Sequence, residues 1–230
     1  FLFRKKKYKD AIVLLKKNSF GDELEIKRNF FLAKSYDLTN QVDSAFKHFN
    51  KANELTKNSH EAKQFDKSKY LFNIDCRKKY FTKKNINKWK PINYSNNNLN
   101  PVFLIGFPRS GTTLLDTILR SHSKIEVIEE EPMVLKMVNA IEKNKFNYLE
   151  NITASKINIL QKKYENELSI HVKNIDKSKL YIDKLPLNII NVGEILRIFP
   201  NSKFIFVLRH PMDCVLSCYM QDFKLNDAMS

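Results

Sequence analysis

The stretch that decides the fold of this chain reads Val102-Phe-Leu-Ile-Gly-Phe-Pro-Arg-Ser-Gly-Thr-Thr-Leu-Leu-Asp116. Its apolar start predicts a buried strand, and the segment after Gly111 has the apolar spacing of an amphipathic helix. Gly106 and Gly111 permit a tight turn between these two elements. The exposed amides at the start of the helix, together with the positive end of its dipole, favour an anion. The stretch therefore predicts a phosphate-binding loop between a strand and a helix.

The predicted loop also carries side chains that suit a phosphate or sulfate group. Arg109 offers a guanidinium fork for oxygen atoms. The hydroxyl donors of the loop are Ser110, Thr112 and Thr113. The glycine spacing matches the nucleotide loop G-x-x-x-x-G-K-[ST], but Thr112 stands where that loop has its lysine. Because this lysine reaches the β and γ phosphates, its replacement argues against an ordinary kinase or NTPase. A glycine turn without a ligand is the simpler alternative.

Beyond this loop the chain alternates short apolar runs with helical segments. The runs predicted as strands are Val102–Gly106, Ile125–Ile128, Leu180–Ile182 and Phe204–Leu208. Strands that alternate with helices are typical of a parallel sheet. We therefore expect an α/β domain over residues 101–230, with a P-loop-like parallel sheet flanked by helices.

A second basic residue is expected at the same edge of the sheet. Arg209 follows the last predicted strand, at the carboxyl end where open α/β sheets bind ligands. Ser217 comes eight residues later on the next helix and can offer a hydroxyl to the same anion. Taken alone, Arg209 can equally form a surface salt bridge. Together with the first loop, it predicts a site for two phosphates.

These motifs resemble those of a known family. The segment Phe107-Pro-Arg-Ser-Gly-Thr-Thr-Leu-Leu115 is similar to the 5′-phosphosulfate loop of sulfotransferases that use 3′-phosphoadenosine 5′-phosphosulfate (PAPS). Arg209 and Ser217 resemble the 3′-phosphate site of these enzymes. Two further motifs are Asp183-Lys-Leu-Pro-Leu-Asn188 and Phe199-Pro-Asn201. The order of all these motifs along the chain is most similar to that in bacterial tetratricopeptide-repeat sulfotransferases, which are related to tyrosylprotein sulfotransferases.

The resemblance covers about residues 101–223 and implies a sulfotransferase fold, here truncated, because relatives continue beyond Ser230. It implies PAPS as the sulfuryl donor, 3′-phosphoadenosine 5′-phosphate (PAP) as the product and no metal. It also implies that Arg109, Ser110, Gly111, Thr112 and Thr113 bind the donor, together with Arg209 and Ser217.

The resemblance also assigns catalytic roles. Glu129, Glu130 and Glu131 follow the second predicted strand, and a carboxylate near the acceptor can act as general base. Similarity to the tyrosylprotein enzymes selects Glu130, which lies 21 residues after Arg109. It assigns Lys184 to the bridging oxygen of the leaving group, a task that Arg109 would share. The alternatives are solvated acids at a helix start and one more surface lysine.

The first 80 residues are interpreted as a helical repeat region. Tyr8, Ala11 and Leu15 recur 34 residues later as Val42, Ala45 and Phe49. A period of about 34 residues is typical of tetratricopeptide helix pairs. We expect incomplete tetratricopeptide-like repeats over residues 1–80 and an Asn-rich linker over 81–100. An ordinary helical hairpin is the alternative.

Composition gives further information on ligands, cysteine chemistry and membrane spans. The formal net charge of +15 suits a phosphate-rich or sulfate-rich ligand, although a general lysine bias explains much of it. Cys76, Cys214 and Cys218 lack the paired spacing of a disulfide scaffold or zinc site. This predicts a reducing, cytoplasmic location and no metal. No apolar run approaches the roughly 20 residues of a membrane span.

The resemblance implies a PAPS-dependent sulfotransferase that modifies a hydroxyl of a protein tyrosine, a carbohydrate or a small molecule. The helical repeats would help to bind a protein or peptide acceptor, and no nucleic-acid partner is expected. Two other functions stay open. One is a nucleotide-binding phosphotransferase with a degenerate P-loop, which would prefer ATP over PAP. The other is a tetratricopeptide scaffold whose α/β domain is inactive, which would bind PAP without turnover.

Overall fold

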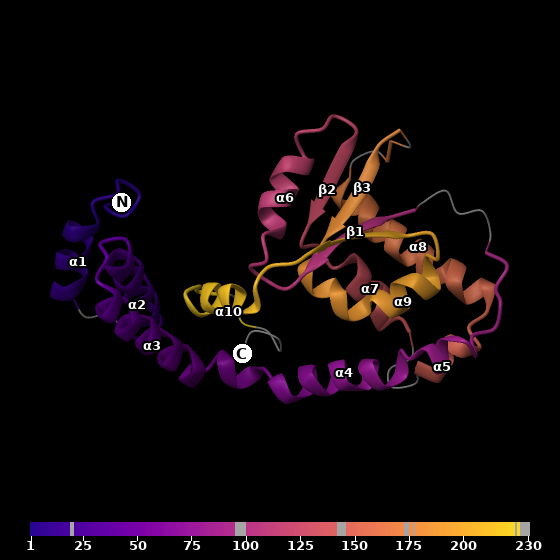
Figure 1. The fold of residues 1–230 in the computed structure, drawn as a ribbon, viewed down its shortest axis with the longest axis horizontal. Helices are drawn as coiled ribbons and strands as arrows, with labels where there is room; N and C mark the ends of the chain where they lie inside the picture. Colours follow the sequence, from indigo (N-terminus) through magenta and orange to yellow (C-terminus); the bar gives the residue numbers. More distant parts are fainter. Residues whose placement is uncertain are drawn as a thin grey trace. The chain divides into compact units, whose positions relative to one another are not determined.

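The computed structural model describes residues 1–18, 21–94, 100–141, 146–172, 175–176, 178–223 and 225. The chain divides into two compact units (Figure 1). One unit is Ile74–Cys214, which carries the sheet, and the other is Phe1–Asn73 with Val215–Ser230. The helices α4 (Lys67–Tyr80) and α10 (Pro211–Tyr219) each have residues in both units.

The sheet of the first unit has four parallel strands among the described residues, in the order β2-β3-β1-β4. The strands are β1 (Val102–Gly106), β2 (Ile125–Glu129), β3 (Leu180–Lys184) and β4 (Lys203–Val207). Every residue of β1 is buried, as expected for an interior strand of a parallel sheet. The predicted α/β class is confirmed, with strand bounds within two residues of those expected.

Helices cover the two faces of this sheet. Their bounds are α6 (Thr112–Leu119), α7 (Met133–Asn139), α8 (Ala154–His171) and α9 (Val192–Ile198), with short 3-10 helices η2 (Phe146–Glu150) and η3 (Pro186–Asn191). One face packs on α7, α8 and α9 through a core that includes Phe103, Tyr164 and Ile195. The other face packs on α6 through Leu115 and Leu119. Alternate residues of each strand thus serve different cores.

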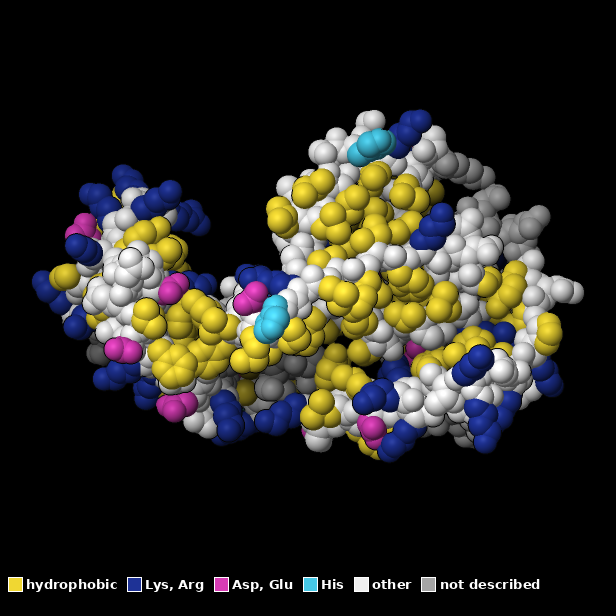
Figure 2. Space-filling model, in the orientation of Figure 1, with side chains coloured by type: hydrophobic (Ala, Val, Ile, Leu, Met, Phe, Trp, Pro, Cys, Tyr) yellow, Lys and Arg dark blue, Asp and Glu magenta, His cyan; other side chains and the backbone are white. Residues whose placement is uncertain are grey.

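Part of the surface of this unit is apolar. Leu114 and Ile118 of α6 are exposed, and so is Phe206 of the edge strand β4. Figure 2 shows hydrophobic side chains gathered over this region. Among the described residues, these side chains lie outside both cores of the sheet.

The segment before β1 is anchored to α9. Arg77 of α4 lies 2.9 Å from Glu194, and Arg197 donates hydrogen bonds to the carbonyls of Lys90 and Leu149 at 3.0 and 2.9 Å. The short helix α5 (Lys83–Ile86) lies within this anchored segment. Residues 95–99 of the expected linker lie outside the described residues, so the extent of the linker stays a prediction.

The second unit is helical. It contains α1 (Tyr8–Lys17), α2 (Asp22–Asp37), α3 (Val42–Asn58) and the 3-10 helix η1 (Ala62–Gln64). Ala45 and Phe49, which belong to the predicted repeat, are buried in a cluster with Leu32, Ala33 and Tyr36 of α2. The helices α2 and α3 pack against each other, and their assignment as a tetratricopeptide repeat stays a prediction. None of the helices in the described residues is long and apolar enough to cross a membrane.

Candidate active site

The loop between β1 and α6 requires both of its glycines. Gly111 precedes α6 with a φ of 109°, a conformation that residues with a side chain rarely adopt. A Cβ on Gly106 would lie 2.8 Å from the carbonyl oxygen of Val207 and 2.9 Å from Ser110 Oγ. One glycine is therefore required by its backbone conformation, and the other by the close approach of β4.

Ser110 gives this loop a buried hydroxyl. Its Oγ is buried and has no hydrogen-bond partner among the described residues. A buried polar group without a partner is costly, and such groups are usually satisfied by protein, water or a ligand. Arg109, directly before it, is exposed and has a φ of 69°, which is uncommon outside glycine. The loop thus combines a strained backbone, a buried hydroxyl and a cation.

The two predicted phosphate-binding arginines lie together. Arg209, which follows β4, donates from Nη1 to the carbonyl oxygen of Arg109 at 3.2 Å. Its Nε lies 3.6 Å from Asp213 Oδ2. Both arginines follow the carboxyl ends of adjacent strands, where α/β sheets bind ligands. Ser217 lies on α10 in the other unit, so its pairing with Arg209 stays a prediction.

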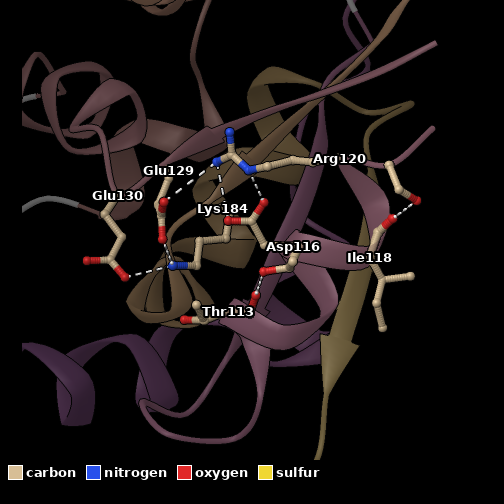
Figure 3. Close-up of polar contacts among 9 residues, drawn as sticks. Thr113, Asp116, Ile118, Arg120, Glu129, Glu130 and Lys184 are labelled. Carbon is tan, nitrogen blue, oxygen red and sulfur yellow. Dashed lines mark hydrogen bonds and ion pairs between the residues drawn. The ribbon is translucent and has the colours of Figure 1, made fainter. Parts of the chain in front are cut away.

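Lys184 and Glu130, each predicted to be catalytic, are in direct contact. Lys184 ends β3 and is in register with Leu104, two residues before Gly106 of the loop. Its side chain is fully buried, and its Nζ lies 2.8 Å from Glu130 Oε1 and 2.9 Å from Glu129 Oε1 (Figure 3). The structure therefore brings the pair to the sheet edge that carries the loop.

Glu129 is a second partner of Lys184 that the sequence reasoning did not assign. It is the last residue of β2 and is in register with Lys184. The contact of Glu129 with Lys184 could have been predicted from this pairing, but only if the strand order β2-β3-β1-β4 had been known. Side chains at paired positions of adjacent strands lie close enough to interact.

The backbone at Glu130 is also tied to β3. Glu130 has a φ of 57°, and its amide donates to the carbonyl oxygen of Lys184 at 2.8 Å. A residue with a side chain in this region is strained by roughly 1–3 kcal/mol and needs support from its surroundings. The hydrogen bond to Lys184 supplies such support, so backbone and side chain of Glu130 are held by the same residue.

Lys184 and Glu129 stabilise each other's charged forms. Burial lowers the pKa of Lys184, but its hydrogen bonds with Glu130 and Glu129 raise it by more, so its pKa lies above the ordinary lysine value. The hydrogen bond with Lys184 holds the pKa of Glu129 below the ordinary glutamate value, although partial burial opposes this. An ammonium group thus stands at the sheet edge with an ionised carboxylate beside it.

Arg120 extends this cluster on the α6 side. Its guanidinium contacts both carboxylate oxygens of Asp116, which is buried, through Nε to Oδ1 and through Nη2 to Oδ2 at 3.2 Å. The same Nη2 lies 3.6 Å from Glu129 Oε2. Figure 3 shows Arg120 between Asp116 and Glu129. A chain of alternating charges therefore runs from α6 to Lys184.

A different polar group lies on the other side of β3. Asp183 is buried, accepts a hydrogen bond from the Tyr164 hydroxyl at 3.1 Å and contacts Asn188 Nδ2 at 3.4 Å. Burial raises its pKa to about 7, although the Tyr164 hydrogen bond opposes this. Burial also raises the pKa of Tyr164 well above its ordinary value. The sequence analysis assigned no role to Asp183, which follows the apolar residues Leu180–Ile182 at the start of β3.

The residues at this edge fit an anionic phosphate or sulfate group. Arg109, Arg209 and Lys184 supply positive charge, and Ser110 supplies a donor without a partner among the described residues. The fold and the site together define an α/β protein with a P-loop-like turn at the carboxyl edge of a parallel sheet.

Comparison with known proteins agrees with this description. A family model described as "Sulfotransferase family" matches residues 101–230. Because the match covers more than half of the chain, the chain belongs to the sulfotransferase family. The predicted family and fold are thereby confirmed at this level. The closer relation to tetratricopeptide-repeat and tyrosylprotein enzymes stays a prediction.

One similar protein comes from Aquifex aeolicus (strain VF5) and carries the description "Uncharacterized protein". It is 33% identical over 201 residues, which cover 84% of this chain. The chain spans only 26% of the length of that relative. No solved structure matches the chain significantly.

Proposed function

We propose that this protein is a sulfotransferase that moves the sulfuryl group of PAPS to the hydroxyl of an acceptor and releases PAP. The observation that carries this proposal is the contact of 2.8 Å between Lys184 Nζ and Glu130 Oε1. This pair lies at the sheet edge that also bears the β1–α6 loop. A base, a cation and an anion-binding loop are the groups that sulfuryl transfer requires.

The loop accounts for donor binding in this proposal. The 5′-phosphosulfate is bound by Arg109, Ser110, Gly111, Thr112 and Thr113, and the 3′-phosphate by Arg209 and Ser217. Guanidinium groups hold phosphate and sulfate oxygens through paired hydrogen bonds. The amides at the start of α6 and the Ser110 hydroxyl add neutral donors. The contact between Arg209 and the Arg109 carbonyl supports one continuous binding surface.

The chemistry then needs one proton acceptor and stabilisation of one leaving oxygen. Glu130 takes the proton of the acceptor hydroxyl while that oxygen forms a bond to sulfur. The bond between sulfur and the bridging oxygen breaks, and its electron pair stays on the phosphate of PAP. Lys184 and Arg109 stabilise this negative charge. The exposed fraction of 59% for the Glu130 side chain supports its access to an acceptor.

Binding of PAP and ATP to the full-length protein tests the proposed donor. Specific binding to the folded protein raises its apparent melting temperature. We expect PAP to raise it and Arg209→Ala to remove the shift. Lys203→Ala is the matched control, because Lys203 is an exposed cation at the opposite end of the same strand. A shift with ATP and none with PAP would contradict the proposal and favour a phosphotransferase.

Turnover with labelled PAPS and a panel of hydroxyl acceptors tests the reaction. The panel contains tyrosine peptides, carbohydrates and small phenols. We expect transfer that Glu130→Gln abolishes while PAP binding persists. PAP binding with no transfer to any acceptor would favour a scaffold with an inactive α/β domain.

We further infer that the helical unit helps to bind a protein or peptide acceptor, in a cytoplasmic setting. Its support is the packed α2–α3 pair, since tandem helix pairs create extended binding surfaces. The expected result is that removal of the segment before α4 (Lys67–Tyr80), which keeps the Arg77–Glu194 contact, weakens transfer to peptides and spares transfer to small phenols. Equal losses for both acceptor types would contradict this role.

A further inference from the structure

The two carboxylates that contact Lys184 are held differently. Glu129 is bound through both oxygens, with Oε1 2.9 Å from Lys184 Nζ and Oε2 3.6 Å from Arg120 Nη2. In the part of the chain that the structure describes, Glu130 is bound through Oε1 alone. One carboxylate therefore lies between two cations, and its neighbour has an oxygen available for a proton (Figure 3).

Arg120 reaches Glu129 from a fixed position. Asp116 lies one turn before it on α6, is 2% exposed and contacts the guanidinium through both oxygens. A buried carboxylate without a cation is costly, so Asp116 keeps the guanidinium in place. The Arg120–Glu129 contact itself is half exposed and contributes only about 0–1 kcal/mol to folding. Its consequence is expected in the charge of the site rather than in stability.

The proposed reaction creates a need that this arrangement meets. When Glu130 takes up the proton of the acceptor, it loses its charge. A buried ammonium group without a counter-ion tends to lose its own proton. Lys184 must nevertheless stay positive to stabilise the leaving oxygen. A second carboxylate that stays ionised throughout the reaction would keep it so.

We propose that Glu129, held by Arg120, is the constant counter-ion of Lys184, and that Glu129 and Arg120 are positioning residues while Glu130 exchanges the proton. The inference rests on the proposed function, because it assigns a division of labour within that reaction. The charged groups that act on Glu129 are Lys184 from β3 and Arg120, directly after α6. Arg120 also interacts with Asp116 and Glu126, and Lys184 also contacts Glu130.

The titration of Lys184 tests this role directly. The Glu130→Gln variant of the full chain imitates the protonated base, and NMR of ¹³Cε-labelled lysine follows Lys184, with Lys184→Arg to identify its signal. We expect Lys184 to stay charged to alkaline pH in this variant. Adding Glu129→Gln should lower its midpoint by at least about one pH unit, a tenfold change in proton affinity. An unmoved midpoint overturns the proposal.

Two control variants keep the result specific. Glu126→Gln removes a carboxylate of the same strand that pairs with Lys179 at 3.0 Å, and it should leave the Lys184 midpoint unchanged. An equal fall in this control would mean a general effect of net charge and would overturn the proposal. Glu129→Asp keeps the charge and should preserve the high midpoint, which guards against a folding defect in Glu129→Gln.

The part played by Arg120 has its own readout. Arg120→Ala should move the Glu129 carboxyl titration to higher pH, and Arg120→Lys should restore it in part, because Arg120 favours the ionised form. If Arg120→Ala leaves the titration midpoint of Glu129 unchanged, Arg120 is not a positioning residue for Glu129. None of these measurements needs donor or acceptor. Failure of PAP binding would therefore contradict the proposed function, while the titrations test separately whether Glu129 is the counter-ion of Lys184.

Discussion

The ammonium group of Lys184 lies 2.8 Å from Glu130 Oε1, although the Lys184 side chain is fully buried and that of Glu130 is 59% exposed. The contact joins the interior of the sheet to its solvent-accessible edge. A buried ammonium needs a counter-ion, and a general base needs access to its substrate. This one contact satisfies both requirements, and Lys184 is therefore the first position to alter.

Replacing Lys184 by methionine should separate charge from packing. Methionine fills a similar volume, and the carboxylates left behind, Glu129 and Glu130, are 47% and 59% exposed and can be solvated. We expect Lys184→Met to fold and to lose transfer by roughly 100–1000-fold, as when one group that stabilises a developing charge is removed. Single-turnover transfer from PAPS in the full-length protein measures this, with Lys179→Met as control. A loss smaller than tenfold would argue against a role of Lys184 at the leaving oxygen.

Ser110→Ala should have opposite effects on stability and on binding. The Ser110 hydroxyl is buried without a partner among the described residues, so its removal should leave the free energy of unfolding unchanged or raise it by about 1 kcal/mol. The same change should weaken PAP binding about tenfold if the Ser110 hydroxyl donates a hydrogen bond to the bound nucleotide. Ser202→Ala is the matched control, since its buried Oγ also lacks a described partner. Equal PAP affinity in both variants would remove Ser110 from the binding site.

The buried acid Asp183 should give the protein a distinctive pH dependence. Its pKa is raised to about 7 in the folded state, from about 3.9 in an unfolded chain. Between these values the folded state binds more protons, so this group lowers the stability as pH rises from about 4 to 7, and its effect levels off above. We expect Asp183→Asn to gain stability relative to the wild type across this range, by a few kcal/mol at most.

Denaturant unfolding at several pH values measures this difference. Asp176→Asn is the control with the opposite sign, because backbone hydrogen bonding from Ser178 lowers the pKa of the exposed Asp176. Replacing the Asp176 carboxylate should lower the free energy of unfolding more at neutral pH than at acid pH. A stability difference for Asp183→Asn that is flat with pH would mean that this carboxyl does not titrate near neutrality.

Gly193→Ala should disturb the anchor between the segment before β1 and α9. A Cβ at this position would collide with the ring of Phe81. We expect a loss of about 1–3 kcal/mol in the free energy of unfolding, as for other overpacked sites. In a Phe81→Leu background the same change should be close to neutral, since alanine favours a helix over glycine. Additive effects in this double-mutant cycle would show that the two residues do not compete for space.

The sequence allowed the fold to be predicted because its signals are local. Apolar runs mark the four described strands, and Gly106 with Gly111 marks the loop. The catalytic roles of Glu130 and Lys184 were predicted from family resemblance alone. Their contact was not predicted, because nothing local joins residues 54 positions apart.

The Asp116–Arg120–Glu129 chain was not foreseen. It depends on how far a guanidinium on α6 reaches toward β2, which the spacing of residues along one element does not determine. Asp183 was missed for a related reason. Its role follows from the face of β3 that it occupies and from the tyrosine that α8 places against it.

The succession of Asp183 and Lys184 in β3 has a consequence for folding. Neighbouring residues of a strand point to opposite faces, so a slip of one residue exchanges their surroundings. The slipped strand would place an ammonium group against Tyr164 in the apolar core and a third carboxylate beside Glu129 and Glu130. Both errors are electrostatically unfavourable. The charges that form the site therefore also specify the register of β3, because a strand shifted by one residue is electrostatically unfavourable.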